Sequence, residues 1–275
     1  MRSIMIVLIT GTSSGIGLSA AVQAAEAGHQ VVATMRDTSR ADALRAASPD
    51  IDVRQLDVTD GDSITAAIDG VIRDYGRLDA VVNNAGAGHI GTVETDSVDN
   101  FRKVMETNFF GVVQVTKAAM PHLRAARGRL ITVTSVGGVV GQPFNEAYCA
   151  AKFAVEGMME SLAPVAAQHG VTVTVVEPGA VASEFVANVG VDVETVFEAA
   201  GPYAPQLKAY VGRTSTSFSG AQTPDEAAAT IMEALTAEQP PFRVQTSDWA
   251  RQFNGVKLAD LDGSAVQKLT SGWIS

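Results

Sequence analysis

The sequence of 275 residues predicts an α/β fold, in which a doubly wound parallel sheet of about seven strands carries helices on both faces. First, strand-like apolar runs alternate with helix-like amphipathic segments along the whole chain. Second, the strand candidates are nearly continuous runs rich in valine and isoleucine, which suits strands buried on both faces of a parallel sheet. Third, a glycine-rich turn joins the first of them to the first helix.

The predicted elements follow one another in a regular order. Strands are predicted at 4–10, 30–35, 52–57, 79–83, 129–135 and 171–177, with a weaker one at 242–246. Alanine-rich segments with helical periodicity lie between them, at roughly 15–28, 61–75, 97–125 and 147–169. Repeated strand–helix–strand units with right-handed crossovers build one twisted parallel sheet.

No change in composition marks a linker, so residues 1–275 are predicted to form a single domain. The stretch 184–222 interrupts the alternation without a clear period, which is typical of a lid or binding loop inserted over a substrate site. An extension at 247–275 contains Trp249 and Trp273 and has no predicted role.

The composition excludes several classes of partner. A net charge of −10 argues against nucleic acid and anionic membranes, since both bind cationic surfaces. The single cysteine, Cys149, cannot form an internal disulfide, and the four histidines have no spacing typical of zinc, so no metal is predicted. The apolar N-terminus runs directly into the glycine turn, which indicates a buried strand rather than a signal peptide. Without a run of about 20 apolar residues, the expected location is the cytoplasm.

Residues 10–17 read TGTSSGIG between a predicted strand and a predicted helix, and this context favours a phosphate-binding turn. Gly11 permits a tight turn, Gly15 lets the backbone approach a pyrophosphate, and Gly17 allows the helix to pack closely on the strand. The helix N-terminus then offers free N–H groups to the phosphates. A plain tight turn is the alternative interpretation. The predicted sheet is therefore of the Rossmann type, with cofactor contacts from Gly11, Ser13, Ser14, Gly15, Ile16 and Gly17.

The glycine spacing TGxxxGxG resembles that of the short-chain dehydrogenase/reductase family, and further motifs follow in the family's order over residues 4–246. The pair DV at 57–58 ends the third predicted strand, where the family contacts adenine. NNAG at 83–86 follows the fourth strand, and PG at 178–179 follows the sixth, where the family's chain lies along the nicotinamide. The resemblance implies further cofactor contacts from Asp57, Val58, Asn84, Ala85, Gly86, Pro178, Gly179, Val181 and Ser183.

Tyr148 and Lys152 are four residues apart in YCAAK, so a helix places them on the same face. A free tyrosine has a pKa of about 10. A nearby ammonium favours the phenolate, so we expect Lys152 to lower the pKa of Tyr148 toward the working range of a general acid/base. A surface tyrosine beside a solvated lysine is the alternative interpretation.

The family resemblance implies roles for four residues, of which Asn108 and Ser135 precede this pair in the chain. Tyr148 would donate or accept the substrate proton, and Lys152 would lower its pKa and bind the nicotinamide ribose. Ser135 would hydrogen-bond the carbonyl oxygen and stabilise its developing charge. Asn108 would hold a water molecule in a proton relay. The complete set implies an enzyme that transfers a hydride between a nicotinamide cofactor and an alcohol or ketone.

NADP is the favoured cofactor, with NAD as the alternative. NAD-specific sites carry a carboxylate about twenty residues past the glycines, where it binds the ribose 2′-hydroxyl. Met35 occupies the family's position for it, and Arg36 follows with a planar fork that suits a 2′-phosphate. Two features favour NAD instead, because Asp37 is adjacent and Ser14 stands where the family's other NADP marker is basic.

The segments 33–37 and 135–152 resemble the branch of the family that contains 17-beta-hydroxysteroid and retinol dehydrogenases, which implies a bulky apolar alcohol or ketone as substrate. Lys208 and Arg213 are expected to be solvated. The apolar residues expected around the substrate are Val136, Val139, Val140, Pro143 and Phe144, with Phe185, Val186, Val189, Val193, Phe197, Tyr203, Leu207, Tyr210 and Phe218 from the insertion.

Two other functions remain open. A 3-oxoacyl thioester reductase would need a basic rim near the site for an acidic carrier protein. Arg124, Arg127 and Arg129 are the candidates for such a rim, although they also suit the cap of a helix C-terminus. A non-catalytic nucleotide-sensing protein on the same fold would keep the glycine turn and lose the catalytic residues.

The helices predicted at 97–125 and 147–169 are apolar on more than one face, which usually means a second packing partner. Phe109 and Phe110 are the largest of these apolar residues. Family members commonly pair through these two helices, so a homodimer or homotetramer is expected.

Overall fold

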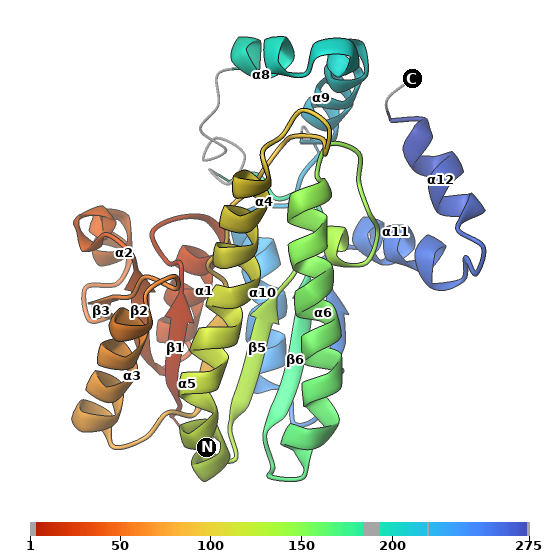
Figure 1. The fold of residues 1–275 in the computed structure, drawn as a ribbon. Coiled ribbons are helices and arrows are strands. Elements are labelled where there is room, and N and C mark those ends of the chain that lie inside the picture. The colour runs from red at the N-terminus through yellow and green to blue at the C-terminus, as the bar shows by residue number, and fades with distance from the viewer. Residues whose placement is uncertain (1–3, 184–192, 219, 274–275) are drawn as a thin grey trace.

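A seven-stranded parallel sheet lies at the centre of the computed structural model, which describes residues 4–183, 193–218 and 220–273 (Figure 1). The strands lie in the order β3-β2-β1-β4-β5-β6-β7. They are β1 (Ile6–Thr10), β2 (Gln30–Met35), β3 (Asp52–Gln55), β4 (Ala80–Asn83), β5 (Arg129–Val133), β6 (Thr172–Glu177) and β7 (Arg243–Gln245). The predicted α/β fold with a Rossmann-type sheet is confirmed, including the weak seventh strand.

β3 and β5 each end two residues earlier than the sequence predicts, because a polar side chain begins a turn at each carboxyl end. Asp57 Oδ1 accepts a hydrogen bond of 2.9 Å from the backbone of Thr59, beyond the end of β3. Ser135 Oγ accepts one of 2.9 Å from the backbone of Gly137, beyond the end of β5. Both side chains therefore lie at the carboxyl edge of the sheet, outside its hydrogen-bonded ladder.

Helices cover both faces of the sheet. The first strand shows why, since Leu8 contributes to the apolar cluster on one face while Val7 and Ile9 contribute to the other. α3 (Gly61–Tyr75), α5 (Gly111–Ala126) and α6 (Glu146–Ala167) pack on the first face, and α1 (Gly15–Glu26), α2 (Asp42–Ala47) and α10 (Pro224–Thr236) on the second. Each inner strand is thus buried on both sides, which explains its continuous apolar run.

The sequence prediction missed α10, although the chain carries a clear start signal for it. Thr223 and Glu226 form a capping box, in which Thr223 Oγ1 accepts from the Glu226 backbone at 3.2 Å and Glu226 Oε2 accepts from the Thr223 backbone at 2.8 Å. Pro224 follows at the first helical position. Small residues such as Ala24 and Ala228 then line the contact between α1 and α10.

A third apolar cluster lies beyond the carboxyl edge of the sheet, where the predicted insertion meets the C-terminal extension (Figure 1). The described part of 184–222 is largely helical rather than a loop, and 184–192 lie outside the described residues. Leu207, Phe253 and Trp273 are buried in this cluster. Its helices are α8 (Val193–Ala199), α9 (Ala204–Phe218), α11 (Asp248–Leu258) and α12 (Ser264–Ser271). In the part of the chain that the structure describes, no helix is long and apolar enough to cross a membrane.

Candidate active site

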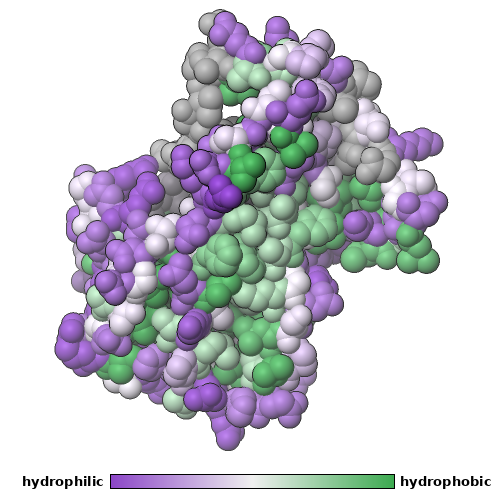
Figure 2. Space-filling view, viewed as in Figure 1, coloured by the Kyte–Doolittle hydropathy of each residue, from purple (hydrophilic) through white to green (hydrophobic). Residues whose placement is uncertain are grey.

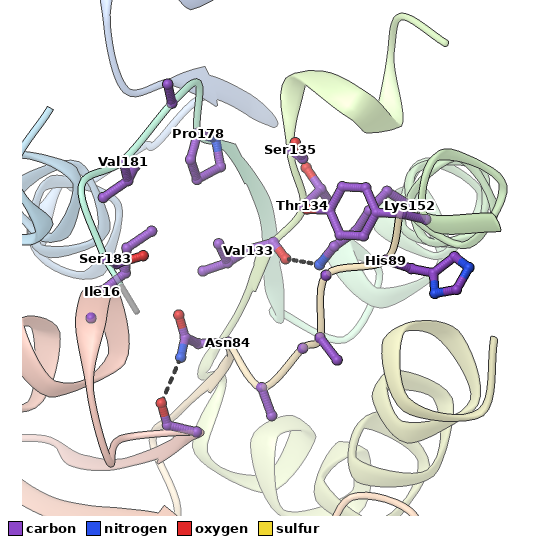
Figure 3. Close-up of a pocket in the computed structure, with 18 of the residues that line it drawn as sticks. Ile16, Asn84, His89, Val133, Thr134, Ser135, Lys152, Pro178, Val181 and Ser183 are labelled. Carbon is purple, nitrogen blue, oxygen red and sulfur yellow. Dashed lines mark hydrogen bonds between the residues drawn. The ribbon is translucent and has the colours of Figure 1, made fainter. Parts of the chain in front are cut away.

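A cavity of about 1170 Å³ lies at the carboxyl ends of the strands, where the strand order reverses between β1 and β4. Gly17 and Asn108 are the two predicted site residues that do not line it. The predicted residues that line it are Gly11, Ser13, Ser14, Gly15, Ile16, Arg36, Asp57, Val58, Asn84, Ala85, Gly86, Ser135, Tyr148, Lys152, Pro178, Gly179, Val181 and Ser183. Segments far apart in the sequence therefore meet in one space, as Figure 3 shows.

The glycine turn lines one end of this cavity, and two of its lining residues, Gly11 and Gly15, have no side chain. Gly11 and Gly15 have φ values of +71° and +58°, a region that favours glycine. A Cβ on Gly11 would lie 2.7 Å from the Ala85 Cα, and one on Gly17 would lie 2.3 Å from the Gly11 carbonyl oxygen. Larger residues are thus excluded, and the N-terminus of α1 faces the cavity directly. These features fit the pyrophosphate of a dinucleotide.

Asn84, in the segment after β4, is hydrogen-bonded to the glycine turn. Its Nδ2 donates hydrogen bonds to the Thr10 and Gly11 carbonyl oxygens, at 2.9 and 3.0 Å (Figure 3). The Ala85 backbone N–H donates to Thr10 Oγ1 at 3.0 Å. The two segments that border the crevice are therefore held at a fixed separation.

The end of β2 presents two arginines to the cavity. Arg36 lines it as predicted, and so does Arg40, which the sequence analysis missed. Asp37 also lines it, but its Oδ1 accepts hydrogen bonds from the Ser39 backbone at 3.0 Å and the Ser39 hydroxyl at 2.7 Å. These bonds hold the pKa of Asp37 below its usual value and orient the carboxylate within its own turn. Two cationic side chains therefore line this end of the cavity.

Tyr148 and Lys152 lie together on α6, as the spacing predicts. Lys152 is 4% exposed, and its Nζ donates a hydrogen bond of 3.0 Å to the Val133 carbonyl oxygen (Figure 3). The Nζ atom lies 5.8 Å from the centroid of the Tyr148 ring. Burial lowers the pKa of Lys152 to about 8.

The expected fall in the Tyr148 pKa is not what the structure shows. Burial raises the pKa of Tyr148 well above its usual value, and a hydrogen bond with Ser135 only partly opposes this. The desolvation of a phenolate in this buried position outweighs the favourable interactions around it. In this environment the protonated phenol is therefore favoured over the phenolate.

Asn108 lies behind the cavity wall, fully buried in a π-helical segment, Glu106–Phe110, between α4 (Val98–Met105) and α5. Its Oδ1 accepts from the Ala87 backbone at 3.0 Å, and its Nδ2 donates to the Ala87 and Val104 carbonyl oxygens at 3.0 and 3.1 Å. The amide thus fixes the backbone just after the NNAG motif. The irregular helix turns this side chain inward, as π-bulges at functional sites often do.

The far end of the cavity has an aromatic wall that the sequence analysis did not foresee. The Trp249 ring stacks on Phe253 at 5.0 Å between centroids, and Phe253 stacks on Trp273 at 5.4 Å. Arg213 is exposed, as predicted, and it also lines the cavity with its Cζ atom 5.0 Å from the Trp273 centroid. The lining residues at this end include Ile90, Val136, Gln142, Asn145, Tyr210, Arg213, Trp249 and Trp273.

Most of the apolar residues predicted to surround the substrate instead form the third cluster. Among the described residues, only Val136 and Tyr210 of that set line the cavity. Phe185, Val186 and Val189 lie outside the described residues, as do the side chains of Val193 and Phe218. The members found in the third cluster or packed against it are Val136, Val139, Val140, Phe144, Phe197, Tyr203, Leu207 and Tyr210, so Val136 and Tyr210 belong to both.

The comparisons with known proteins agree with this site. A family model described as short chain dehydrogenase matches residues 5–194. Retinol dehydrogenase 8 of Homo sapiens is 35% identical, over 96% of this chain and 88% of its own. The 17-beta-hydroxysteroid dehydrogenase type 1 of Homo sapiens is 36% identical, over 94% of this chain and 82% of its own. Both relatives come from the branch that the sequence analysis predicted.

Solved structures share the fold. A short-chain dehydrogenase from Streptomyces avermitilis has a TM-score of 0.80 and 32% identity, over 99% of both chains. A short-chain dehydrogenase/reductase from Burkholderia phymatum in complex with NAD has a TM-score of 0.80 at 22% identity, over 94% of this chain and 95% of its own. ElxO with NADP bound has a TM-score of 0.73 at 24% identity, over 91% and 100%. The chain therefore belongs to the short-chain dehydrogenase/reductase family, whose members are NAD(P)-dependent oxidoreductases that act on alcohols and carbonyl compounds.

Proposed function

We propose that this protein transfers a hydride between NADP(H) and a bulky hydrophobic alcohol or ketone, with Tyr148 as the general acid/base. One observation carries the proposal. A single cavity has a glycine turn and two arginines at one end, Tyr148 and Lys152 in the middle, and an aromatic wall at the other. The insertion and the C-terminal extension both contribute to that wall, so we assign them to substrate binding.

The residues present fit a dinucleotide with a 2′-phosphate. The backbone of the glycine turn and the N-terminus of α1 would hold the pyrophosphate, and Arg36 with Arg40 would hold the 2′-phosphate. Lys152 would bind the nicotinamide ribose. When bound, the cofactor supplies or accepts the hydride, and all remaining chemistry falls to the protein.

Proton transfer is the part of the reaction that the protein performs. During reduction, Tyr148 Oη gives its proton to the carbonyl oxygen as negative charge develops there. Ser135 Oγ accepts from the Gly137 backbone at 2.9 Å, so its own hydroxyl proton is available to the phenol or the substrate oxygen. Lys152 stabilises the phenolate that remains. Asn108 lies behind the cavity wall, and its role in a proton relay through water stays a prediction.

The basic rim that a thioester reductase would need is not formed by the three candidate arginines. Arg124 and Arg127 lie at the C-terminus of α5, and Arg129 begins β5, so all three are at the opposite edge of the sheet from the cavity. Arg129 donates hydrogen bonds to the Ala234 and Ala237 carbonyl oxygens at 2.9 and 2.6 Å. Arg129 therefore caps the C-terminus of α10, which is the structural role that the sequence analysis gave as the other interpretation.

The aromatic wall predicts a preference for large apolar substrates. We expect kcat/KM for a bulky hydrophobic ketone, such as a steroid or a decalone, to exceed that for a small or anionic carbonyl compound by at least about tenfold. Trp249→Ala should lower kcat/KM for the bulky ketone by about tenfold and that for a small ketone much less, because Trp249 is half exposed within the cavity. A panel of ketones with NADPH and NADH in parallel, followed at the cofactor absorbance, measures both effects.

The control for this experiment is Leu258→Ala, which removes an exposed apolar side chain from the same helix, away from the cavity. It should leave kcat/KM for every ketone within about twofold of wild type. Faster turnover of a small sugar or keto acid than of the bulky ketone would contradict the proposed substrate class.

An exposed apolar area on the helical face predicts self-association. Figure 2 shows hydrophobic surface over α5 and α6, and Phe110, Phe153 and Val165 are 46%, 37% and 62% exposed there. We expect light scattering at about micromolar concentration to give the mass of a dimer or tetramer. Phe110→Glu should shift it toward the monomer, while Leu261→Glu, at a fully exposed site elsewhere, should not. A monomeric wild type would contradict this prediction.

A further inference from the structure

Two buried carboxylates lie directly behind the proposed catalytic pair and have no role in the chemistry described above. Glu156 is 4% exposed and Glu177 is fully buried. Buried acids are costly unless they are paired, so their presence requires an explanation. Glu156 lies one helical turn past Lys152 on α6, which places the two side chains on the same face of the helix.

Glu156 is bound to the segment that also binds Lys152. Thr134 Oγ1 donates a hydrogen bond of 2.5 Å to Glu156 Oε1. Thr134 lies between Val133, whose carbonyl oxygen accepts from Lys152 Nζ at 3.0 Å, and Ser135 at the cavity wall. Figure 3 shows Val133, Thr134 and Ser135 following one another beside Lys152. One carboxylate thus fixes the backbone that orients two of the proposed catalytic residues.

Arg243 joins the two buried acids and links them to the surface. Its Nε lies 3.2 Å from Glu156 Oε2 and 3.4 Å from Glu177 Oε1, and its Nη2 lies 2.5 Å from Glu160 Oε2. Glu177 Oε2 also accepts hydrogen bonds from Gln245 and Asn254, at 2.7 and 2.6 Å. With three carboxylates around one guanidinium, the group carries net negative charge when all are ionised.

Glu156 is the member of this group whose charge acts on Lys152. Burial lowers the pKa of Lys152 to about 8, and the charge of Glu156 opposes that fall. The pKa of Glu156 is raised to about 7: burial is the largest cause and the charge of Glu177 adds to the rise, while the hydrogen bond from Thr134 and the charge of Arg243 oppose it. The charged groups that face Glu156 are therefore Lys152 and Glu160 on α6, Glu177 on β6 and Arg243 on β7.

We propose that Glu156 is a positioning residue for the Tyr148–Lys152 pair, which balances the Lys152 charge and fixes the backbone that binds its Nζ. The inference rests on the proposed function, because Glu156 can support catalysis only if Tyr148 and Lys152 are the catalytic pair. Removal of a proton from the pair is harder next to a negative charge, so an ionised Glu156 keeps the pair protonated to higher pH. At pH values where Glu156 is itself protonated, this support disappears.

The test is the pH dependence of kcat/KM for ketone reduction with saturating NADPH. In this direction activity falls at high pH, as the Tyr148–Lys152 pair loses its proton. Glu156→Gln keeps the shape of the side chain and removes its charge, so the falling limb should move to lower pH by about one pH unit. Below about pH 6 the variant and wild type should have the same profile, because Glu156 is then uncharged in both. Glu156→Asp, which keeps the charge, should leave the limb close to that of wild type.

Glu160→Gln is the matched control, because it also removes a carboxylate that pairs with Arg243 from the same helix, at a site 61% exposed. Its limb should coincide with that of wild type, and an equal shift in both variants would overturn the inference. If Glu156→Gln does not fold, Thr134→Val replaces it. Without the Thr134 hydroxyl, the pKa of Glu156 rises and less of its charge is present at a given pH. The falling limb of the pH profile should therefore again move to lower pH. An unmoved limb in the folded variant overturns the inference.

Failure of the inference and failure of the proposed function give different results. A fully active Tyr148→Phe overturns the proposed function and this inference with it. An inactive Tyr148→Phe together with an unshifted limb in Glu156→Gln overturns the inference alone.

Discussion

Tyr148→Phe is expected to lower kcat by about 10²–10⁴-fold, the range ascribed to general acid/base catalysis. The substitution keeps the ring and removes the hydroxyl, which is the proposed proton donor to the substrate. Because burial raises the pKa of Tyr148, the wild-type phenol stays protonated at neutral pH and is ready to give its proton to a ketone. Steady-state turnover with NADPH and the best ketone of the panel measures the loss, and a fluorescence titration measures NADPH binding, which should change little.

Tyr210→Phe is the control for this experiment. Tyr210 lines the same cavity, is 5% exposed, and burial raises its pKa to about 12. Its hydroxyl accepts a hydrogen bond of 2.6 Å from Asn145, so its removal disturbs the cavity wall without touching the proposed proton path. The loss in kcat should stay below about tenfold. Wild-type turnover in Tyr148→Phe would show that another group moves the proton.

The cofactor end of the site could be predicted from the sequence because short, contiguous segments build it. Each motif follows a strand directly, and parallel strands bring their carboxyl ends to the same edge of the sheet. Eighteen of the predicted residues line the cavity, because the turn after β1 and the segment after β4 define this edge of the sheet. Arg40 escaped prediction because a short 3₁₀ turn, Thr38–Arg40, returns it to the cavity.

The substrate end could not be predicted, because contacts between distant segments build it. Trp249 lies on α11 and Trp273 lies just beyond the end of α12, and both pack against Phe253 of a cluster that includes Leu207 from α9. Nothing local in the sequence indicates that α9 packs against α11 and α12 beyond the carboxyl edge of the sheet. The same limit explains why Val139 and Phe144, which are close to Ser135 in sequence, proved to be core residues.

The direction of the Tyr148 pKa shift is a second property that the sequence alone could not predict. The i,i+4 spacing correctly places Lys152 beside it, and from spacing alone a lowered pKa follows. The extent of burial decides the sign, and burial depends on how α6 packs against the end of β5. The same spacing places Glu156 four residues past Lys152, on the same face of the helix. Its hydrogen bond with Thr134, however, depends on the packing of α6 and could not be predicted from spacing.

Arg36→Ala is expected to weaken NADPH binding by about ten- to a hundredfold, with a much smaller effect on NADH. A hydrogen bond to a charged group contributes roughly 1.5–3 kcal/mol, and only NADPH carries the 2′-phosphate that Arg36 would meet. Arg40 lines the same end of the cavity, so Arg40→Ala should produce a loss in the same direction, and the double variant a larger one. Dissociation constants of both cofactors from fluorescence titration measure the change in preference.

Arg45→Ala is the matched control, because Arg45 is an exposed arginine of nearby α2 that does not line the cavity. It should leave the ratio of the two dissociation constants unchanged, which separates a specific contact from the general loss of one positive charge. Equal losses of NADPH and NADH in Arg36→Ala would contradict the phosphate assignment. A wild type that prefers NADH would assign this position to Asp37 instead, whose carboxylate would then have to leave Ser39 to reach the ribose, and Asp37→Ala would weaken NADH selectively.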